Sequence, residues 1–465
     1  MTGLPRVGAG RRAVFLAPSA YLWGGVQTWL DQTARGLRER GWHVTLGLVE
    51  GARFHIPASY VQVHPGHRTV RVPCLTGTPE GRARAVVRML EETRPDVLVV
   101  VNVADGLEGA RRWKQTSAGR ALRVVYSIHA FLAGQMADVL SYVGTVDRVV
   151  GTNRLLEKAL ATAFDNGVPV GYAPYGTEAP LAKRQPSSAA GRPLRLAWVG
   201  RMEEPQKRTA DLGLLMRRCL EMKLDFRCDV VGDGPSAATL RSQLAGIDEA
   251  GQVRLLGYLS RERLYEVLYP EVDALLLTSS WETGPIVAWE AMRHGATLVS
   301  TRYVGAREEG ALKDGENCLL AEVGDIEGLA RAVSRLREED VLLERLRGNA
   351  RVMADGRYSL EASTDAWDGE LAAALEAPAG RPALPGPRRT ARGRLDRCFG
   401  PGLGETLRSV AGRVGERGGP GDEWPHELPE KSVTKEQVEE KLEGVFGPDF
   451  AAVLGRDEGV LNLGP

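Results

Sequence analysis

Short apolar runs alternate with longer amphipathic stretches from Ala13 to about residue 376. The runs predict strands buried on both faces, and the stretches between them have the spacing of apolar positions that is typical of helices. One series of predicted strands covers residues 13–17, 43–49, 96–101, 123–127 and 146–150. A second series covers 194–199, 227–231, 253–256, 273–277 and 297–300, and helices are predicted at 26–39, 82–92 and 210–222 among others.

This alternation predicts α/β domains in which helices cover both faces of a parallel sheet. Residues 181–193 are rich in Pro, Ser, Ala and Gly, which is typical of a linker between domains. We therefore predict two Rossmann-like domains, at 1–190 and 191–376, followed by a C-terminal extension at 377–465.

The extension has a different composition. Residues 381–417 carry nine basic against three acidic side chains, and residues 418–465 carry four basic against eleven acidic ones. Such charge blocks are typical of solvated tails. A capping-box pattern at 434–437, followed by an apolar face, nevertheless predicts a short helix that docks on another part of the protein. The basic part has its own apolar face, at Leu403, Leu407 and Val410, which suits either a linker helix or an anionic membrane surface.

Overall composition narrows the partners and the compartment. Sixty basic residues balance sixty acidic ones, so nothing favours a nucleic-acid partner. No apolar run approaches the roughly 20 residues that a membrane helix needs. The five cysteines form no Cys-x-x-Cys pair, and the N-terminal apolar run resembles a first strand more than an export signal. We expect a cytoplasmic protein that contacts the inner face of the membrane only peripherally, if at all.

The segment 281–292 carries the clearest chemistry. A strand, a polar loop and a helix start follow one another there, and this is where α/β sheets offer backbone N–H groups to phosphates. Gly284 permits a close approach of a ligand, and Pro285 suits the first helical position ahead of Ile286. Glu282 stays on the loop, and Glu290 lies about 1.4 turns into the helix. A phosphate cradle between two hydroxyl acceptors suits a nucleotide-sugar.

This segment resembles the signature of the family 4 retaining glycosyltransferases. The resemblance implies the GT-B fold, in which two Rossmann-like domains face each other across a cleft. It also implies that Glu290 binds the ribose of the donor, and that Glu282 and the Gly284–Ile286 backbone face the donor sugar and the diphosphate. The form Glu-Thr-Gly-Pro differs from the commoner one with Phe-Gly, which leaves the donor sugar open.

A second segment, from Gly200 and Arg201 to Lys207, resembles the Gly-Arg…Lys element of the same family. The resemblance implies that Arg201 and Lys207 clamp the diphosphate and stabilise its departure without a metal ion. Fixed cations are what a leaving diphosphate requires, because negative charge accumulates on it in the transition state.

The N-terminal half resembles the family at two points. The loop with Gly24 and Gly25 is similar to a family Gly-Gly loop, and His129 is similar to a histidine that contacts the donor sugar. Ala130 stands where an aspartate is frequent in the family. In the C-terminal half, Gly232 and Gly257 close strands and are similar to turns that shape the pocket for the base, although such turns also end strands without binding anything.

Together these segments predict a metal-independent retaining glycosyltransferase with no cofactor. Its donor would be a nucleotide-diphosphate sugar, with UDP or GDP favoured, and its acceptor an unidentified hydroxyl compound. Two alternatives stay open at this point. One is a nucleotide-sugar epimerase or a sugar-phosphorylating relative, and the other is a non-catalytic GT-B protein that binds a nucleotide-sugar or a partner.

Overall fold

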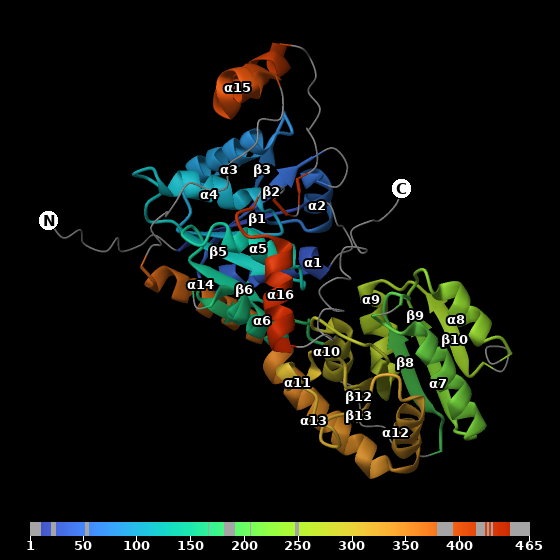
Figure 1. The fold of residues 1–465 in the computed structure, drawn as a ribbon. Coiled ribbons are helices and arrows are strands. Elements are labelled where there is room, and N and C mark those ends of the chain that lie inside the picture. The colour runs from blue at the N-terminus through green and yellow to red at the C-terminus, as the bar shows by residue number, and fades with distance from the viewer. Residues whose placement is uncertain are drawn as a thin grey trace. The chain divides into compact units, whose positions relative to one another are not determined.

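The structure is a computed structural model that describes residues 11–19, 25–51, 55–165, 167–180, 191–204, 206–246, 251–378, 394–414, 424–425, 427–428 and 431–446. It contains two compact units, of which the first is Met1–Ala173 with Thr364–Pro465 and the second is Pro174–Ser363. Each unit is built on one parallel sheet flanked by helices (Figure 1). The predicted α/β class with two Rossmann-like domains is confirmed.

In the described part of the first unit, the strands lie in the order β3-β2-β1-β4-β5-β6-β7. They are β1 (Arg12–Ala17), β2 (His43–Glu50), β3 (Arg68–Pro73), β4 (Val97–Val101), β5 (Arg123–Ile128), β6 (Arg148–Gly151) and β7 (Val170–Tyr172). The two outermost strands, β3 and β7, were not predicted. Polar side chains interrupt β3 and β7 has only three residues, so neither has the continuous apolar run that marks a central strand.

The N-terminal segment and the helix after the second unit share one core. The indole of Trp29 lies 5.1 Å from that of Trp367 and 6.2 Å from the ring of Phe15, measured between centroids. The helices of this unit are α1 (Gly25–Glu39), α2 (Pro57–Val63), α3 (Pro79–Thr93), α4 (Asp105–Lys114), α5 (Ala133–Leu140), α6 (Arg154–Phe164) and most of α14 (Leu360–Glu376). The units therefore divide at 173/174 and 363/364, whereas the sequence predicts domain borders at 190/191 and 376/377.

The second unit has the strand order β10-β9-β8-β11-β12-β13 among its described residues. The strands are β8 (Leu194–Val199), β9 (Phe226–Val231), β10 (Val253–Gly257), β11 (Ala274–Leu277), β12 (Thr297–Thr301) and β13 (Leu319–Ala321). Because β8 and β11 are neighbours, the chain runs outward from them in opposite directions. Such a reversal opens a crevice at the carboxyl ends of the two central strands.

Helices fill a separate hydrophobic core on each face of this second sheet. One face is covered by α7 (Thr209–Glu221), α8 (Ala237–Gln243), α12 (Ile326–Glu338) and the first half of α13 (Asp340–Tyr358). The other is covered by the second half of α13, α10 (Ile286–Arg293), α11 (Ala306–Glu309) and a helical run made of α9 (Arg261–Arg263), η2 (Leu264–Leu268) and η3 (Tyr269–Glu271).

The extension contributes two helices to the first unit, α15 (Arg394–Val414) and α16 (Lys435–Phe446). The predicted docking helix is confirmed, because α16 packs on α5 and α6 and buries Val438 and Leu442 (Figure 1). Its capping box is present, with Thr434 and Gln437 each accepting a hydrogen bond from the backbone N–H of the other. Among the described residues, no helix is long and apolar enough to span a membrane.

Helix α15 bends at Gly400, whose φ is +76°, and Pro401 follows it. Its buried Glu405 accepts hydrogen bonds from the hydroxyls of Thr76 and Thr78, at 2.5 and 2.6 Å. Leu403, Leu407 and Val410 are exposed, so the apolar face noted in the sequence is open on this helix.

Candidate active site

The candidate site is formed by two loops of the second unit, at the carboxyl ends of β8 and β11. The first loop runs from Gly200 to Arg208, and the second from Thr278 to Pro285. Backbone hydrogen bonds join them: Ser280 N–H donates to the Gln206 carbonyl at 2.8 Å, and the Thr278 hydroxyl donates to the Lys207 carbonyl at 2.7 Å. The two loops are thus held together at the point where the strand order reverses.

At the centre of these loops, Lys207 pairs with Glu282. The ammonium group of Lys207 lies 2.8 Å from Oε1 and 3.1 Å from Oε2 of Glu282. Oε1 also accepts a hydrogen bond from the Ser279 hydroxyl at 2.5 Å. The Glu282 side chain is 5% exposed and that of Lys207 is 18% exposed, so the cation is the more open partner. The structure therefore brings these two predicted residues together.

Arg201 begins the first loop and has a different environment. Its guanidinium pairs with Glu203 at 2.7 Å, and its side chain is 44% exposed. A guanidinium this exposed can rotate toward a ligand at the strand end. Arg201 and Lys207 thus lie on the same loop, and of the two only Lys207 is anchored to a buried carboxylate.

Glycines close the neighbouring strands around this loop. Gly232 has a φ of +135°, and a Cβ built on it would lie 1.8 Å from the carbonyl oxygen of Gly200. The Gly232 N–H donates to the carbonyl of Gly257 at 2.9 Å, and the Gly200 N–H donates to Val231 at 3.1 Å. Gly200, Gly232 and Gly257 therefore support the cation-bearing loop through close backbone packing across three adjacent strands.

Helix α10 begins just after the second loop. Gly284 has a φ of +105°, a conformation that favours glycine. The sequence predicts Pro285 as the first helical residue, but α10 begins at Ile286 because the ψ of Pro285, 86°, is not helical. That prediction is wrong by one residue. The first turn of α10 still belongs to the segment that follows Glu282, and within it the Ala288 N–H donates to the Pro285 carbonyl at 2.8 Å.

Glu290, on the second turn of α10, is 4% exposed, and within the described residues the hydrogen-bond partners of its carboxylate are side chains of the helical run 261–271. Oε1 accepts from Tyr265 at 3.0 Å and from Nε of Arg261 at 3.2 Å, and Oε2 accepts from Tyr269 at 2.9 Å. Burial raises the pKa of Glu290, whereas these three partners act to lower it. Sequence reasoning missed all three, although Arg261, Tyr265 and Tyr269 recur every fourth residue.

His129 and Gly25 belong to the first unit. His129 follows β5, is 6% exposed, and has its Nε2 2.9 Å from the Ser127 hydroxyl and its ring against Trp29 at 4.4 Å between centroids. Burial lowers the pKa of His129 to about 3, so the imidazole is neutral. Gly25 is the first residue of α1, and Gly24 lies outside the described residues.

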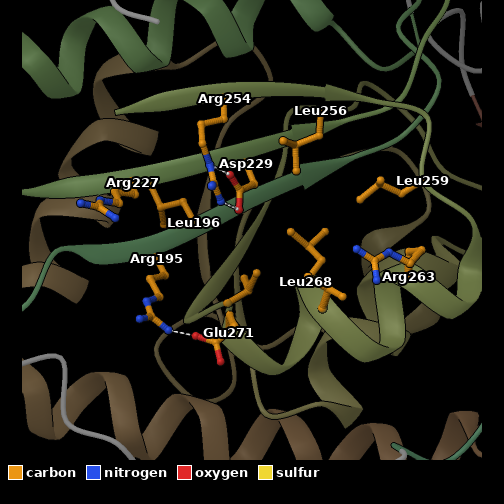
Figure 2. Close-up of a pocket in the computed structure, with 12 residues that line it drawn as sticks. Arg195, Leu196, Arg227, Asp229, Arg254, Leu256, Leu259, Arg263, Leu268 and Glu271 are labelled. Carbon is orange, nitrogen blue, oxygen red and sulfur yellow. Dashed lines mark hydrogen bonds and ion pairs between the residues drawn. The ribbon is translucent and has the colours of Figure 1, made fainter. Parts of the chain in front are cut away.

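A separate pocket of about 480 Å³ opens on the face of the second sheet (Figure 2). Arg254 and Asp229 form an ion pair across it, at 2.6 and 2.7 Å, and Arg195 pairs with Glu271. These strand residues lie before the strand ends, whereas Lys207 and Glu282 follow them. The pocket is therefore distinct from the site. Within the described residues, no cluster of three or more His, Cys, Asp or Glu side chains has the arrangement of a metal site.

Fold and site together define a protein with two Rossmann-like units, the second of which carries a Lys–Glu pair at its topological switch point. Comparison with protein families identifies both halves. The model "Glycosyltransferase Family 4" matches residues 23–166, and "Glycosyl transferases group 1" matches residues 193–339. The chain belongs to the family 4, or group 1, glycosyltransferases and has the GT-B fold.

Individual relatives agree with this assignment. The lipopolysaccharide core biosynthesis glycosyltransferase LpsE of Rhizobium meliloti is 32% identical over 138 residues, which are 30% of this chain and 39% of LpsE. The chain therefore spans about two fifths of that relative. Anabaena HepE in complex with UDP superimposes with a TM-score of 0.64 and 20% identity, over 78% of this chain and 100% of HepE. The apo galactosyltransferase WaaB gives 0.62 and 15%, over 78% and 99%.

Proposed function

We propose that the protein is a retaining glycosyltransferase that moves a sugar from a nucleotide-diphosphate sugar to an acceptor hydroxyl. One observation carries the proposal: Lys207 and Glu282 are paired on two joined loops at the switch point of a family 4 sheet. Ligands of such sheets bind outside the carboxyl ends of the central strands. Arg201 reaches the same crevice from the end of β8.

In this proposal the cations stabilise the departing diphosphate. Two of the three N–H groups of the Lys207 ammonium are directed at Glu282, which leaves the third for a phosphate oxygen. Arg201 can offer its planar fork to a second oxygen. The first-turn N–H groups of α10 add partial positive charge. Because two side chains and a helix end supply this charge, we propose that transfer needs no metal ion and no cofactor.

The environment of Glu282 supports retention without a protein nucleophile. A nucleophilic carboxylate needs an accessible oxygen, but Oε1 accepts from both Lys207 and Ser279, and Oε2 accepts from Lys207. The acceptor hydroxyl would instead lose its proton to the leaving phosphate, on the same face of the sugar from which that phosphate departs. In the first unit, neutral His129 would contact the donor sugar as a hydrogen-bonding group and not as an acid.

The donor and the acceptor are inferred by analogy. HepE is described in complex with UDP and with UDP-glucose, and LpsE is described as acting in lipopolysaccharide core biosynthesis. We propose a UDP-sugar donor and a hydroxyl of a saccharide as the acceptor. A cytoplasmic location belongs to the same proposal, and the five free cysteines support it. No observation on the described residues favours the epimerase or the non-catalytic alternative.

The test is thermal stabilisation by UDP, GDP, ADP and TDP, followed by nucleotide release from the matching sugars with and without saccharide acceptors. A ligand at 100 times its Kd stabilises by about 2.7 kcal/mol. We expect one nucleotide to raise the Tm, and its release from the sugar to depend on acceptor and to be lost in Lys207→Ala. Equal release without acceptor would indicate an epimerase-like or hydrolytic enzyme. The absence of any shift would contradict the proposed function.

A further inference from the structure

The carboxylate of Glu290 is held by a cluster of side chains that the proposed mechanism does not use. Tyr265 and Tyr269 donate their hydroxyl protons to different oxygens of Glu290, and both tyrosines are buried. Arg261 donates to Oε1 through Nε and to the Tyr265 hydroxyl through Nη2, at 3.0 Å. A cation and two aromatic hydroxyls therefore converge on one carboxylate.

The chain places the two tyrosines by an irregular helix. Residues Leu264–Leu268 form a π-helical turn, in which the N–H of Tyr269 donates to the carbonyl of Leu264 five residues earlier. Pro270 follows and has no N–H with which to continue the helix, so the run tightens into a 3-10 turn. Single π-helical turns are rare and frequently occur at functional sites. Here the turn contains Tyr265 and ends immediately before Tyr269, the two residues whose hydroxyls reach Glu290.

The His294 ring packs against the same cluster. Its ring packs on Tyr265 at 4.6 Å and on Tyr269 at 5.3 Å between centroids, and its Nδ1 lies 2.7 Å from the backbone carbonyl of Glu290. Nδ1 must carry a proton to make this contact. The ring thus packs against both phenols that bind the carboxylate.

The lone pairs of Glu290 can be counted. A carboxylate has about four acceptor positions, two on each oxygen. Oε1 accepts from Tyr265 and Arg261, so it is full, whereas Oε2 accepts, among the described residues, only from Tyr269. One position on Oε2 is left for a ligand. A ribose offers two neighbouring hydroxyls, so this arrangement has room for only one of them.

We infer that Tyr265 and Tyr269 are positioning residues that keep Glu290 ionised and aimed, with a single acceptor position on Oε2 for one ribose hydroxyl of the nucleotide. The inference rests on the proposed function, because it takes Glu290 as the contact to the ribose. Beyond that function, it names the residues that position the Glu290 carboxylate and states that this carboxylate accepts one hydrogen bond from the ribose.

The ionisation of Glu290 depends on these donors. Burial favours the neutral acid, and hydrogen bonds to the charged form oppose it. Both phenols stay protonated, because burial and the nearby carboxylate raise the pKa of Tyr265 and of Tyr269 far above their usual range. Removing one phenol hydroxyl therefore raises the pKa of Glu290. A protonated Glu290 is a weaker acceptor for a sugar hydroxyl, so binding by these variants should weaken as the pH falls.

The experiment measures the Kd of UDP by calorimetry between pH 5.5 and 8.5 for wild type, Tyr265→Phe and Tyr269→Phe. Tyr303→Phe is the matched control, because the Tyr303 hydroxyl is buried in the same unit without a hydrogen-bond partner. We expect each clamp variant to bind about tenfold more weakly at pH 6.5, as for loss of one buried hydrogen bond to a charged group. Part of this affinity should return at pH 8.5. The control should bind like wild type throughout.

A second arm tests the single acceptor position with 2′-deoxy-UDP and 3′-deoxy-UDP. On wild type, we expect one analogue to bind about tenfold more weakly than UDP and the other within twofold of it. On Glu290→Ala, that difference should disappear. Equal weakening of both analogues on wild type would show that Glu290 binds both hydroxyls, and would overturn the single-position inference.

The outcomes distinguish failure of the proposed function from failure of the positioning role of the tyrosines. If wild type binds none of UDP, GDP, ADP or TDP, the proposed function fails and this inference fails with it. If wild type binds UDP and both clamp variants bind it equally well at every pH, the function stands and the positioning role is overturned. A loss that is the same at every pH would mean that the tyrosines only support the fold, which also overturns it.

Discussion

Two glutamates with seven residues between them, Glu282 and Glu290, show how one residue type acquires two different properties in the same unit. Both are buried, at 6% and 4% exposed. Glu282 is paired with Lys207, a cation that remains partly open to solvent. Glu290 is held by the Arg261 guanidinium and by two phenols that are themselves buried. The first carboxylate anchors a cation that a ligand can share, and the second is a fixed acceptor.

The physical difference is in what a ligand must displace. A phosphate that approaches Lys207 adds a third hydrogen bond to an ammonium group and leaves the ion pair in place. A hydroxyl that approaches Glu290 must fit the remaining position on Oε2. Charge therefore governs ligand binding at Glu282, whereas the positions of the hydrogen-bond donors govern it at Glu290. Substitutions that separate charge from geometry test this contrast.

The largest effect is expected for Lys207→Ala. This change removes a charge contact to the leaving diphosphate, which costs about 10²- to 10³-fold in kcat. It also leaves the buried Glu282 carboxylate without its cation, which destabilises the fold. The double variant Lys207→Ala with Glu282→Gln should regain the lost Tm but not the lost kcat. Recovery of both by the double variant would mean that Lys207 acts only by neutralising Glu282.

Arg201→Ala is expected to have the next largest effect. Loss of one transition-state charge contact should lower kcat by about 100-fold. The Tm should stay within a degree or so, because the side chain is 44% exposed and, within the described part of the chain, pairs only with Glu203. The control is Arg302→Ala, since Arg302 is also 44% exposed and paired with a carboxylate, that of Asp314. If both variants lose the same activity, Arg201 has no specific role.

The sequence predicts the Glu282 region better than the Glu290 region. Lys207 and Glu282 were predicted because their segments resemble family elements that follow strand ends, and strands of an α/β domain bring such ends together. The tyrosines on Glu290 follow Arg261 at four-residue spacing, but nothing in that spacing shows that they face Glu290, which lies on a different helix. The outer strands β3 and β7 were missed for a related reason, since edge strands carry weaker apolar patterns.

The borders of the two compact units depend on long-range packing, which local sequence patterns do not reveal. Nothing near residue 376 shows that Trp367 packs on Trp29, more than 300 residues away in the chain. The linker prediction rested on composition at 181–193, most of which lies outside the described residues. Long-range packing decides where a compact unit ends, whereas composition reports only where a chain is free to bend.

Substitutions of Gly232 and Gly257 test whether these glycines support the loop that carries Arg201 and Lys207. In Gly232→Ala the new Cβ would lie 1.8 Å from the Gly200 carbonyl oxygen, and the alanine would have to adopt a φ of +135°. We therefore expect the free energy of unfolding to fall by about 2–3 kcal/mol and the donor to bind more weakly. In Gly257→Ala the φ of +65° is strained but the space is open, so about 1–2 kcal/mol is expected with unchanged donor Kd. Urea unfolding and UDP titration measure both. Equal effects on UDP binding would show that the contact with Gly200 does not support the site.

The smallest effect extends the contrast to the first unit, where burial lowers the pKa of His129 and keeps its imidazole neutral. Its pKa falls from 6.5 to about 3, so between these pH values the unfolded chain binds a proton that the native protein does not. Acidification therefore favours unfolding, by up to about 1.4 kcal/mol per pH unit below 6.5. His129→Asn should remove this slope and leave stability at pH 8 less affected. We would measure the urea midpoint of both proteins at pH 8, 7, 6 and 5. If the difference between them does not change with pH, His129 is not held neutral by burial, and its proposed role as an uncharged contact to the donor sugar loses its physical basis.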